Sequence, residues 1–192
     1  MIGIIGSGNV GANTAFFLAE KGVDHVMLYD IQDGMAKGKA LDMMEAAPIR
    51  GYRTSISGTD NDKDILDCDI IIITAGAVRK PGMKRDALLK ETWQLIECYA
   101  SKITNPVAKV INLSEPVDVL TTLFTSKSKL PAKQIIGLGG ILDATRLRYL
   151  IAEKLSVATE NVAAQVKGHH TDDMILLRDY CCVSGITLDN FM

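Results

Sequence analysis

The sequence predicts an α/β fold, a doubly wound parallel sheet, followed by the beginning of an α+β domain. Two observations support this prediction. Apolar runs of strand length alternate with helical patterns as far as about Gly137, and parallel strands need crossover connections of that kind. Past Gly140 the alternation changes. We therefore expect a first domain at residues 1–140 and the N-terminal part of a second, incomplete domain at residues 141–192.

Strands are predicted where short apolar runs lie between turn residues. The clearest is at residues 69–74, where four isoleucines in succession lead to Thr74, Ala75 and Gly76. Such a continuous run is typical of a central parallel strand that is covered on both faces. In chain order, the predicted strands of the first domain are residues 2–5, 25–29, 54–57, 69–74, 109–113 and 134–137.

Helices are predicted between these strands from apolar residues at helical spacing. The helix at residues 34–47 should end at Pro48, because proline cannot continue a helix. The helix that begins after Pro116 should cover residues 117–124. The other predicted elements are helices at residues 12–21, 86–102 and 142–155, and a strand at residues 161–166.

Composition excludes several classes of protein. The chain has 192 residues, of which 47% are hydrophobic, and its net charge of −2 comes from interspersed acids and bases. The hydrophobic fraction is sufficient for a core, and the charge distribution provides no basic surface for nucleic acid. No segment has the length of a membrane span, and the N-terminus lacks the positive region of a signal peptide. We expect a cytoplasmic protein without a membrane partner.

The four cysteines show no metal-ligand spacing, and we predict no metal site. Cys68 and Cys98 lie in apolar patterns, which favours thiols buried in the core. The adjacent Cys181 and Cys182 could form a redox-active pair, which is the less favoured alternative.

The first thirty residues contain a glycine-rich turn between a strand and a helix. The turn consists of Gly6, Ser7, Gly8, Asn9, Val10 and Gly11, and the next predicted strand ends at Asp30. Glycines at these positions allow a tight turn, close approach of a pyrophosphate and close packing of helix on strand, while the helix N-terminus offers free N–H groups to phosphate. Asp30 can accept hydrogen bonds from ribose hydroxyls and would repel a 2′-phosphate. This pattern predicts NAD as the cofactor, whereas a lone glycine pattern would often mark only a tight turn.

Ligands of doubly wound sheets bind beyond the C-terminal ends of the strands. The loops after Ile5, Tyr29, Thr74 and Leu113 should therefore line one crevice. Arg79 and Arg85 bracket a Pro-Gly turn beyond the strand that ends at Thr74, and arginine suits bidentate carboxylate binding. A solvated basic loop is the alternative interpretation.

Three further residues could take part in chemistry at this site. Asp143 and Arg146 lie three residues apart on a predicted helix and so share a face. His170 follows a predicted strand and a glycine, and histidine transfers protons near neutral pH. A surface salt bridge and a structural histidine are the alternatives.

Several short motifs occur along the whole chain: Asp30, Ala40-Leu41-Asp42-Met43, Thr74-Ala75-Gly76, Arg79-Lys80-Pro81-Gly82-Met83, Pro116-Val117-Asp118, Leu142-Asp143 with Arg146, and Gly168-His169-His170. In order and spacing they resemble the motifs of the lactate/malate dehydrogenase family. The loop that begins at Arg79 resembles the malate branch, because lactate enzymes typically carry glutamine at that position.

The resemblance implies a Rossmann NAD-binding fold and hydride transfer between NAD and malate or oxaloacetate. It implies that Arg146 and Arg79 bind the two substrate carboxylates, and that Arg85 polarises the reacting C–O bond. His170 would exchange the hydroxyl proton with the substrate, oriented by Asp143. The further cofactor-binding positions that it implies are Thr74, Ala75, Gly76, Thr92, Leu113 and Glu115.

The chain departs from the family pattern at three positions. Glu115 and Thr92 each replace an asparagine, and Thr171 replaces a glycine. A carboxylate at position 115 would face a dianionic substrate and, at about 4 Å and an effective dielectric constant of about 20, would cost about 4 kcal/mol. Thr92 removes an amide from the cofactor wall, and Thr171 restricts the backbone.

Family members continue past the position of Met192, so the resemblance also implies a truncated or degenerate member. In the family, the helix at residues 34–47 packs against a partner subunit, so a full-length chain should form a homo-oligomer. Three alternatives to a malate dehydrogenase stay open. These are a non-catalytic NAD-binding module, a fragment that pairs with a separate C-terminal chain, and a lactate dehydrogenase.

Overall fold

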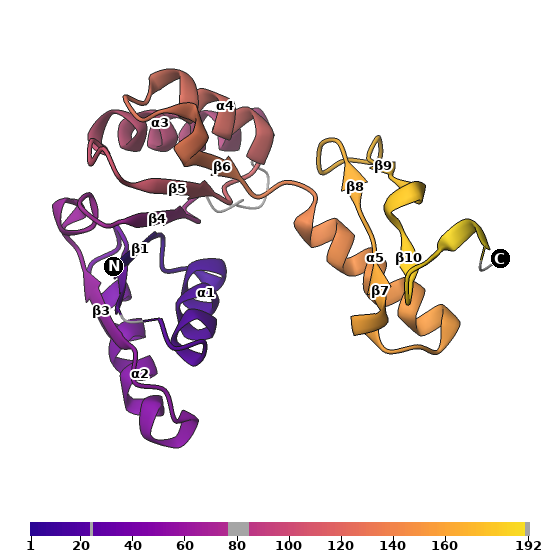
Figure 1. Ribbon diagram of the computed structural model, residues 1–192. Helices are drawn as coiled ribbons and strands as arrows, with labels where there is room; N and C mark the ends of the chain where they lie inside the picture. Colours follow the sequence, from indigo (N-terminus) through magenta and orange to yellow (C-terminus); the bar gives the residue numbers. More distant parts are fainter. Residues whose placement is uncertain (24, 77–84, 191–192) are drawn as a thin grey trace. The chain divides into compact units, whose positions relative to one another are not determined.

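The computed structural model describes residues 1–23, 25–76 and 85–190, with the side chains of residues 77–88 outside the described part. The chain forms two compact units, Met1–Gly137 and Leu138–Met192. Figure 1 labels most of the helices and strands of both units.

The first unit is built on a sheet of six parallel strands. In space the strands follow the order β3-β2-β1-β4-β5-β6, which confirms the predicted doubly wound fold. The central pair is in register from Ile2 opposite Ile70 to Ile5 opposite Ile73. The strands are β1 (Ile2–Ile5), β2 (His25–Tyr29), β3 (Ser55–Thr59), β4 (Ile70–Ile73), β5 (Lys109–Asn112) and β6 (Ile135–Gly137).

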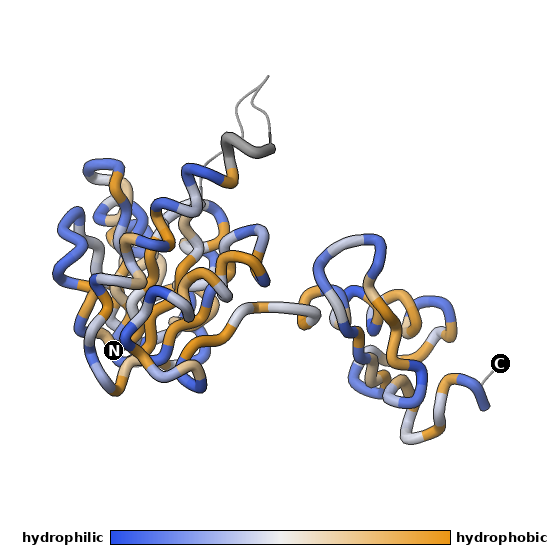
Figure 2. The backbone as a smooth tube through the Cα atoms, turned by 90° about the horizontal axis from the view of Figure 1, so that it is seen from above, coloured by the Kyte–Doolittle hydropathy of each residue, from blue (hydrophilic) through white to orange (hydrophobic). Residues whose placement is uncertain are grey.

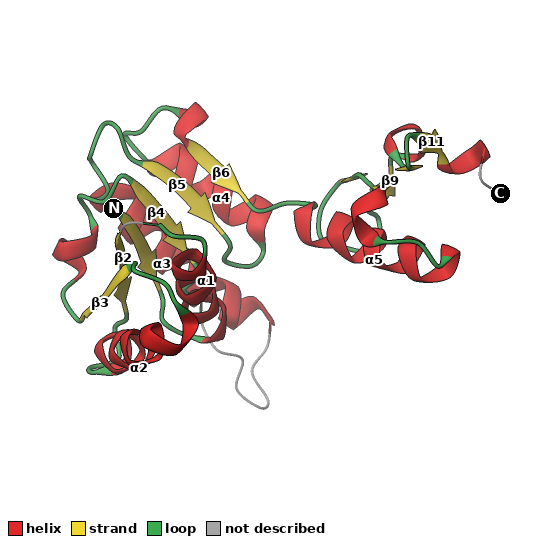
Figure 3. Cartoon of the chain, turned by 60° about the horizontal axis from the view of Figure 1, so that its bottom comes forward, coloured by secondary structure: helices red, strands yellow, loops and turns green. Residues whose placement is uncertain are grey.

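Helices cover both faces of this sheet, as Figure 3 shows. The alternation of side chains along β4 explains why. Ile72 joins the core beneath α1 and α2, whereas Ile71 and Ile73 join the core beneath α3 and α4. Apolar and polar stretches accordingly alternate along the backbone (Figure 2). The helices are α1 (Asn9–Glu20), α2 (Met35–Arg50), α3 (Arg85–Lys102) and α4 (Val117–Lys127).

Three predicted helix boundaries were wrong. α4 ends at Lys127 rather than residue 124, because its last turn consists of polar residues that no apolar pattern marks. α1 begins at Asn9 rather than residue 12, because the glycine turn itself starts the helix: the Ala12 N–H donates to the Gly8 carbonyl at 2.9 Å. α2 continues through Pro48 to Arg50. Proline near the end of a helix costs one intrahelical hydrogen bond, and the turn is closed instead by Gly51, whose N–H donates to the Ala47 carbonyl at 2.8 Å.

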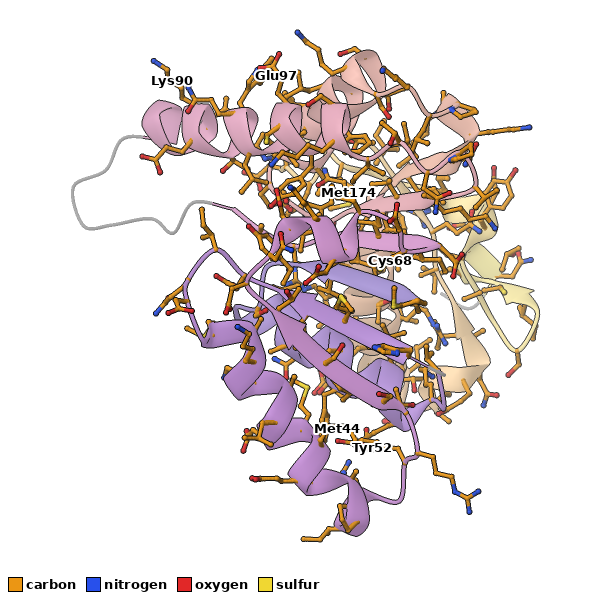
Figure 4. All side chains as sticks on the ribbon, turned by 90° about the vertical axis from the view of Figure 1, so that its left-hand side faces the viewer. Met44, Tyr52, Cys68, Lys90, Glu97 and Met174 are labelled. Atoms are coloured by element: carbon orange, nitrogen blue, oxygen red, sulfur yellow. The ribbon has the colours of Figure 1, made fainter. Side chains whose placement is uncertain are left out.

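Contacts from the following segment also hold the last turns of α2. The Tyr52 hydroxyl donates to the Met43 carbonyl, and the Ile56 N–H donates to the Met44 sulfur at 3.2 Å. Met44 and Tyr52 are both labelled in Figure 4. These tertiary contacts outweigh the local effect of the proline.

The second unit has a helix and short antiparallel strands. The predicted strand at residues 161–166 was wrong, because this stretch changes partner halfway: Val162 pairs with Val183, whereas Val166 pairs with Leu176. A small core of Ala152, Val162 and Val183 joins the helix to the first of these strands. The elements are α5 (Ile141–Leu155), β7 (Val162–Ala163), β8 (Val166–Lys167), β9 (Ile175–Leu176), β10 (Cys182–Val183) and β11 (Ile186–Thr187).

Within the described ranges, no helix is long and apolar enough to cross a membrane. The same ranges contain no group of three or more histidine, cysteine or acidic side chains that could hold a metal ion.

Candidate cofactor site and His–Asp pair

The glycine turn between β1 and α1 packs tightly at two of its three glycines. Gly6 has a φ of +99°, which L side chains rarely adopt. A Cβ on Gly11 would lie 1.9 Å from the Gly6 carbonyl oxygen, so helix and strand require glycine there. A Cβ on Gly8, by contrast, would meet no atom within 4 Å. The turn therefore leaves open space at Gly8, where a ligand can approach the backbone.

The N-terminus of α1 faces this space without a cap from the chain. Gly8 is the N-cap residue, no side chain bonds to the cap, and the first turn carries no acidic residue. The first N–H groups of a helix attract anions, both as donors and through the helix dipole. This end of α1 therefore suits a phosphate group.

Asp30 links the glycine turn to the end of β2 through hydrogen bonds. One of its carboxylate oxygens accepts the Ser7 N–H at 2.7 Å, and the other accepts the Gln32 N–H at 3.0 Å. A carboxylate has about four acceptor positions, so both oxygens retain capacity for ribose hydroxyls. Ser7 itself is buried, and its backbone serves to position Asp30.

A cavity of about 720 Å³ opens beside the turn, within the size range of ligand sites. Most of the predicted cofactor residues line it: Gly6, Gly8, Asn9, Val10, Gly11, Asp30, Thr74, Ala75 and Gly76. Ser7, Thr92, Leu113 and Glu115 are not among the lining residues of this cavity.

The wall that α3 contributes to this cavity was not predicted from the sequence. Four lining residues, Leu95, Cys98, Tyr99 and Lys102, recur at the spacing of one helix face. That spacing was the available signal, but of these four residues only Cys98 was predicted, as a buried core thiol. For Cys98 the assignment was wrong, because its side chain is exposed, whereas Cys68 is buried as predicted.

An ion pair and an aromatic contact define the far end of the cavity. Lys102 pairs with Asp62, and its ammonium lies 5.7 Å from the centre of the Tyr99 ring. The hydrogen bond to Asp62 raises the pKa of Lys102, and burial raises the pKa of Tyr99. At neutral pH this end of the cavity therefore has a charged lysine and a neutral phenol.

The loops at the C-terminal ends of β1, β4 and β5 are bonded to one another. The Thr74 hydroxyl donates to the Gly6 carbonyl at 3.0 Å, and the Ser114 hydroxyl donates to the Ala75 carbonyl at 2.6 Å. Thr92 is buried and its side chain lies 3.9 Å from a Cβ placed on Gly76. These contacts fix the wall of the cavity on the β4 side.

Glu115 lies just beyond β5 with an exposed side chain. Its Oε2 accepts the Val117 N–H at 3.3 Å, so the carboxylate lies at the N-terminus of α4. Leu113, the other predicted residue on this loop, donates its N–H to the Ile73 carbonyl at 2.8 Å. Arg79 and the side chain of Arg85 lie outside the described residues.

The second unit brings together three of the predicted site residues, His170 and Asp143 for proton transfer and Arg146 for carboxylate binding. The His170 Nδ1 lies 2.7 Å from Asp143 Oδ2, and an Arg146 nitrogen lies 3.6 Å from the other oxygen of the same carboxylate. The Asp143 side chain is 10% exposed, against 47% for His170. A carboxylate only accepts, so Nδ1 carries the proton and Nε2 of a neutral ring is left as the base.

The adjacent cysteines do not support a redox pair. Cys181 is buried and its sulfur lies 3.3 Å from the Leu177 carbonyl, while Cys182 belongs to β10. Cys181 precedes this strand with an extended backbone, φ −101° and ψ 119°. Successive side chains of extended backbone point to opposite sides, so the two thiols diverge.

A parallel sheet with a glycine turn on an open helix N-terminus, and with an acid at the end of the adjoining strand, defines the dinucleotide-binding class of α/β proteins. The chain belongs to the lactate/malate dehydrogenase family. Residues 1–137 match the family model described as lactate/malate dehydrogenase, NAD binding domain.

Individual relatives agree with this assignment. A malate dehydrogenase of Methanosarcina acetivorans is 41% identical over 193 residues, which cover all of this chain and 63% of the relative. The structure of the Picrophilus torridus malate dehydrogenase in its apo form matches with a TM-score of 0.92 and 38% identity, over 100% of this chain and 61% of that one. A Plasmodium falciparum malate dehydrogenase in complex with NADH matches with a TM-score of 0.89 and 35% identity, over 99% and 60%. The chain thus spans somewhat less than two thirds of the length of these relatives.

Substitution of the two differently packed glycines should separate folding from ligand binding. Gly11→Ala should destabilise the first unit by roughly 3 kcal/mol, because the new methyl group overlaps the Gly6 carbonyl. Gly8→Ala should leave the melting temperature nearly unchanged but weaken NADH binding, because its methyl group occupies the open space. Thermal melts and fluorescence titration measure the two effects. Equal destabilisation by both substitutions would contradict this assignment of the glycines.

Proposed function

We propose that this chain is the cofactor-binding and initial catalytic part of an NAD-dependent malate dehydrogenase, which transfers hydride between malate and oxaloacetate. The observation that carries the proposal is the His170–Asp143 contact of 2.7 Å, with Arg146 on the same carboxylate. These residues resemble the family's motif, and the chain belongs to the family through residues 1–137. A neutral base beside a fixed carboxylate suits proton exchange with a substrate hydroxyl.

NAD is the proposed cofactor, and it supplies a ring that accepts or donates hydride. The backbone at Gly8 and the N-terminus of α1 would hold its pyrophosphate, and Asp30 would accept its ribose hydroxyls. The charge of Asp30 would repel the 2′-phosphate of NADP. Thr74, Ala75 and Gly76 would form the wall of the site.

On the substrate, Arg146 would bind the carboxylate next to the reacting carbon. His170 would take the hydroxyl proton at Nε2 during oxidation of malate and return it during reduction of oxaloacetate. Asp143 would fix the ring and stabilise its charged form. The roles of Arg79 on the distal carboxylate and of Arg85 on the reacting C–O bond complete the proposal. The Arg79 assignment carries the preference for malate over lactate.

We also infer the setting and the assembly of the protein. All four cysteines are free thiols, which fits a reducing cytoplasm. On α2, Leu41 is 61% exposed and Ile49 is 90% exposed. Such apolar surface favours burial against a second copy, so we infer a homo-oligomer that uses this helix.

A second candidate function is a non-catalytic NAD-binding module. It is favoured by Glu115, a carboxylate held at the N-terminus of α4 beside the proposed site. The discriminating experiment is oxaloacetate-dependent oxidation of NADH by the purified chain, followed by absorbance. Turnover supports the dehydrogenase. A folded chain that binds NADH without turnover supports the module.

Bound NADH should protect one cysteine from alkylation. Cys98 lines the cavity and is exposed, so N-ethylmaleimide should modify it readily in the free chain. With NADH at about ten times its Kd, labelling of Cys98 should slow about tenfold, because about a tenth of the sites stay free. Peptide mapping by mass spectrometry measures this rate.

Cys182 and Cys68 serve as internal controls for the alkylation. Cys182 is half-buried in the second unit, and its labelling should not respond to NADH. Burial raises the pKa of Cys68 to about 11, so this thiol should stay unlabelled at neutral pH. An unchanged rate at Cys98 under saturating NADH would refute the assignment of the cavity to the cofactor.

A further inference from the structure

Glu115 is anchored to the wall of the candidate cofactor site. The preceding residue, Ser114, is buried and its hydroxyl donates to the Ala75 carbonyl at 2.6 Å. Ala75 in turn lines the cavity. The Ser114 N–H also bonds to the buried side chain of Asn112 at 3.2 Å. The backbone at position 115 is therefore held in place next to the end of β4.

The charge of Glu115 is held in place as well. Its Oε2 accepts the Val117 N–H at 3.3 Å, at the first residue of α4. A carboxylate is stabilised at a helix N-terminus, where the dipole is positive. Among the described residues, no ion pair involves this carboxylate. The loop after β5 thus carries a negative charge at a defined place.

The order of the strands indicates which part of a bound dinucleotide would lie near Glu115. Neighbouring strands run β2-β1-β4-β5, with Asp30 following β2 and Glu115 following β5. Three strand spacings separate these two loops, or roughly 14 Å. A dinucleotide with its adenosine ribose at Asp30 and its pyrophosphate at α1 extends toward β4 and β5, as in other doubly wound sheets. The nicotinamide end of the cofactor, which reacts, would then lie on the side of Glu115.

We propose that Glu115 makes this site select the oxidised cofactor, NAD⁺, over NADH. The inference rests on the proposed function, because it takes the cofactor to be NAD. The nicotinamide ring carries one positive charge in NAD⁺ and none in NADH. The Glu115 carboxylate attracts that charge, whereas its repulsion of the two phosphates is the same for both forms and cancels in the ratio of their dissociation constants.

The test compares the Kd values of NAD⁺ and NADH for the wild-type chain and for Glu115→Gln. Glutamine can still accept the Val117 N–H, so the local fold is maintained. In Glu115→Gln, the ratio of the Kd of NAD⁺ to the Kd of NADH should rise about fivefold, which is the effect of losing one exposed charge pair. The rise should come from weaker NAD⁺ binding. Glu115→Asn serves as a second variant with a shorter side chain.

Glu45→Gln is the matched control. Glu45 is an exposed glutamate of α2, about 15 Å along the helix from Met35 at the cavity. This control makes the same change in net charge and should leave the ratio unchanged. Isothermal titration at low and high salt measures all constants. An unchanged ratio in both Glu115 variants, with both cofactors bound, overturns this inference alone; a wild-type chain that binds neither cofactor overturns the proposed function with it.

Discussion

Replacement of His170 by asparagine should lower oxaloacetate-dependent oxidation of NADH by about 1,000-fold, with little change in NADH binding. The reason is that Nε2 is the proposed proton carrier, and proton transfer by a positioned side chain contributes about 100- to 10,000-fold to a rate. Asparagine can still donate to Asp143 but has no basic nitrogen. Steady-state kinetics should therefore show a loss in kcat larger than any change in KM.

Two further variants make this result specific. Asp143→Asn should lower kcat as well, because an amide no longer selects the tautomer with the proton on Nδ1. His169→Asn should retain most of the activity, since His169 is the exposed neighbour to which no proton transfer is assigned. If His170→Asn kept the wild-type rate, the role of proton carrier would have to be reassigned.

Replacement of Glu115 by asparagine should raise kcat/KM for oxaloacetate by about 100-fold. A carboxylate at about 4 Å from a substrate carboxylate costs about 4 kcal/mol at an effective dielectric constant of about 20, and solvent exposure at Glu115 reduces this cost. Asparagine removes the charge and supplies an N–H donor. The gain should appear mainly as a lower KM, because the repulsion acts already on the bound substrate.

Salt and a matched substitution test the electrostatic explanation of this gain. Added salt screens exposed charges, so the difference between Glu115→Asn and the wild-type chain should shrink as ionic strength rises. Glu45→Gln, which changes the same charge on α2, should leave kcat/KM unchanged. If turnover did not rise at all while NADH binding stayed intact, the charge of Glu115 would not be what limits the reaction.

Local sequence patterns were sufficient to predict the sheet and the glycine turn. The four isoleucines of β4 predicted a strand covered on both faces, and Ile71 and Ile72 do lie in different cores. The glycines and Asp30 could be predicted because their roles depend on a backbone turn of six residues and on adjoining strand ends. Periodicity and turn chemistry act over short distances, so they can be read from the chain directly.

The wall formed by α3 was not predicted, because a helix face against a cavity has the same spacing as a face against the core. Cys98 and Tyr99 lie next to each other in the chain, but only Tyr99 is buried. The end of α2 and the split of the strand at residues 161–166 were missed for a related reason. Both depend on partners that are distant in sequence, such as Ile56 for Met44 and Leu176 for Val166.

For this protein the sequence alone determined the fold class, the order of the elements, the glycine turn with its acid and, through family motifs, the identity of the proposed catalytic residues. Only the tertiary structure decided that Asp143 and His170, 27 residues apart, form a contact of 2.7 Å, that Asp30 holds the turn through Ser7, and that Glu115 lies on the N-terminus of α4. The reason is physical. Strand and turn propensities are set by near neighbours, whereas the environment of a side chain is set by whichever distant segments pack against it.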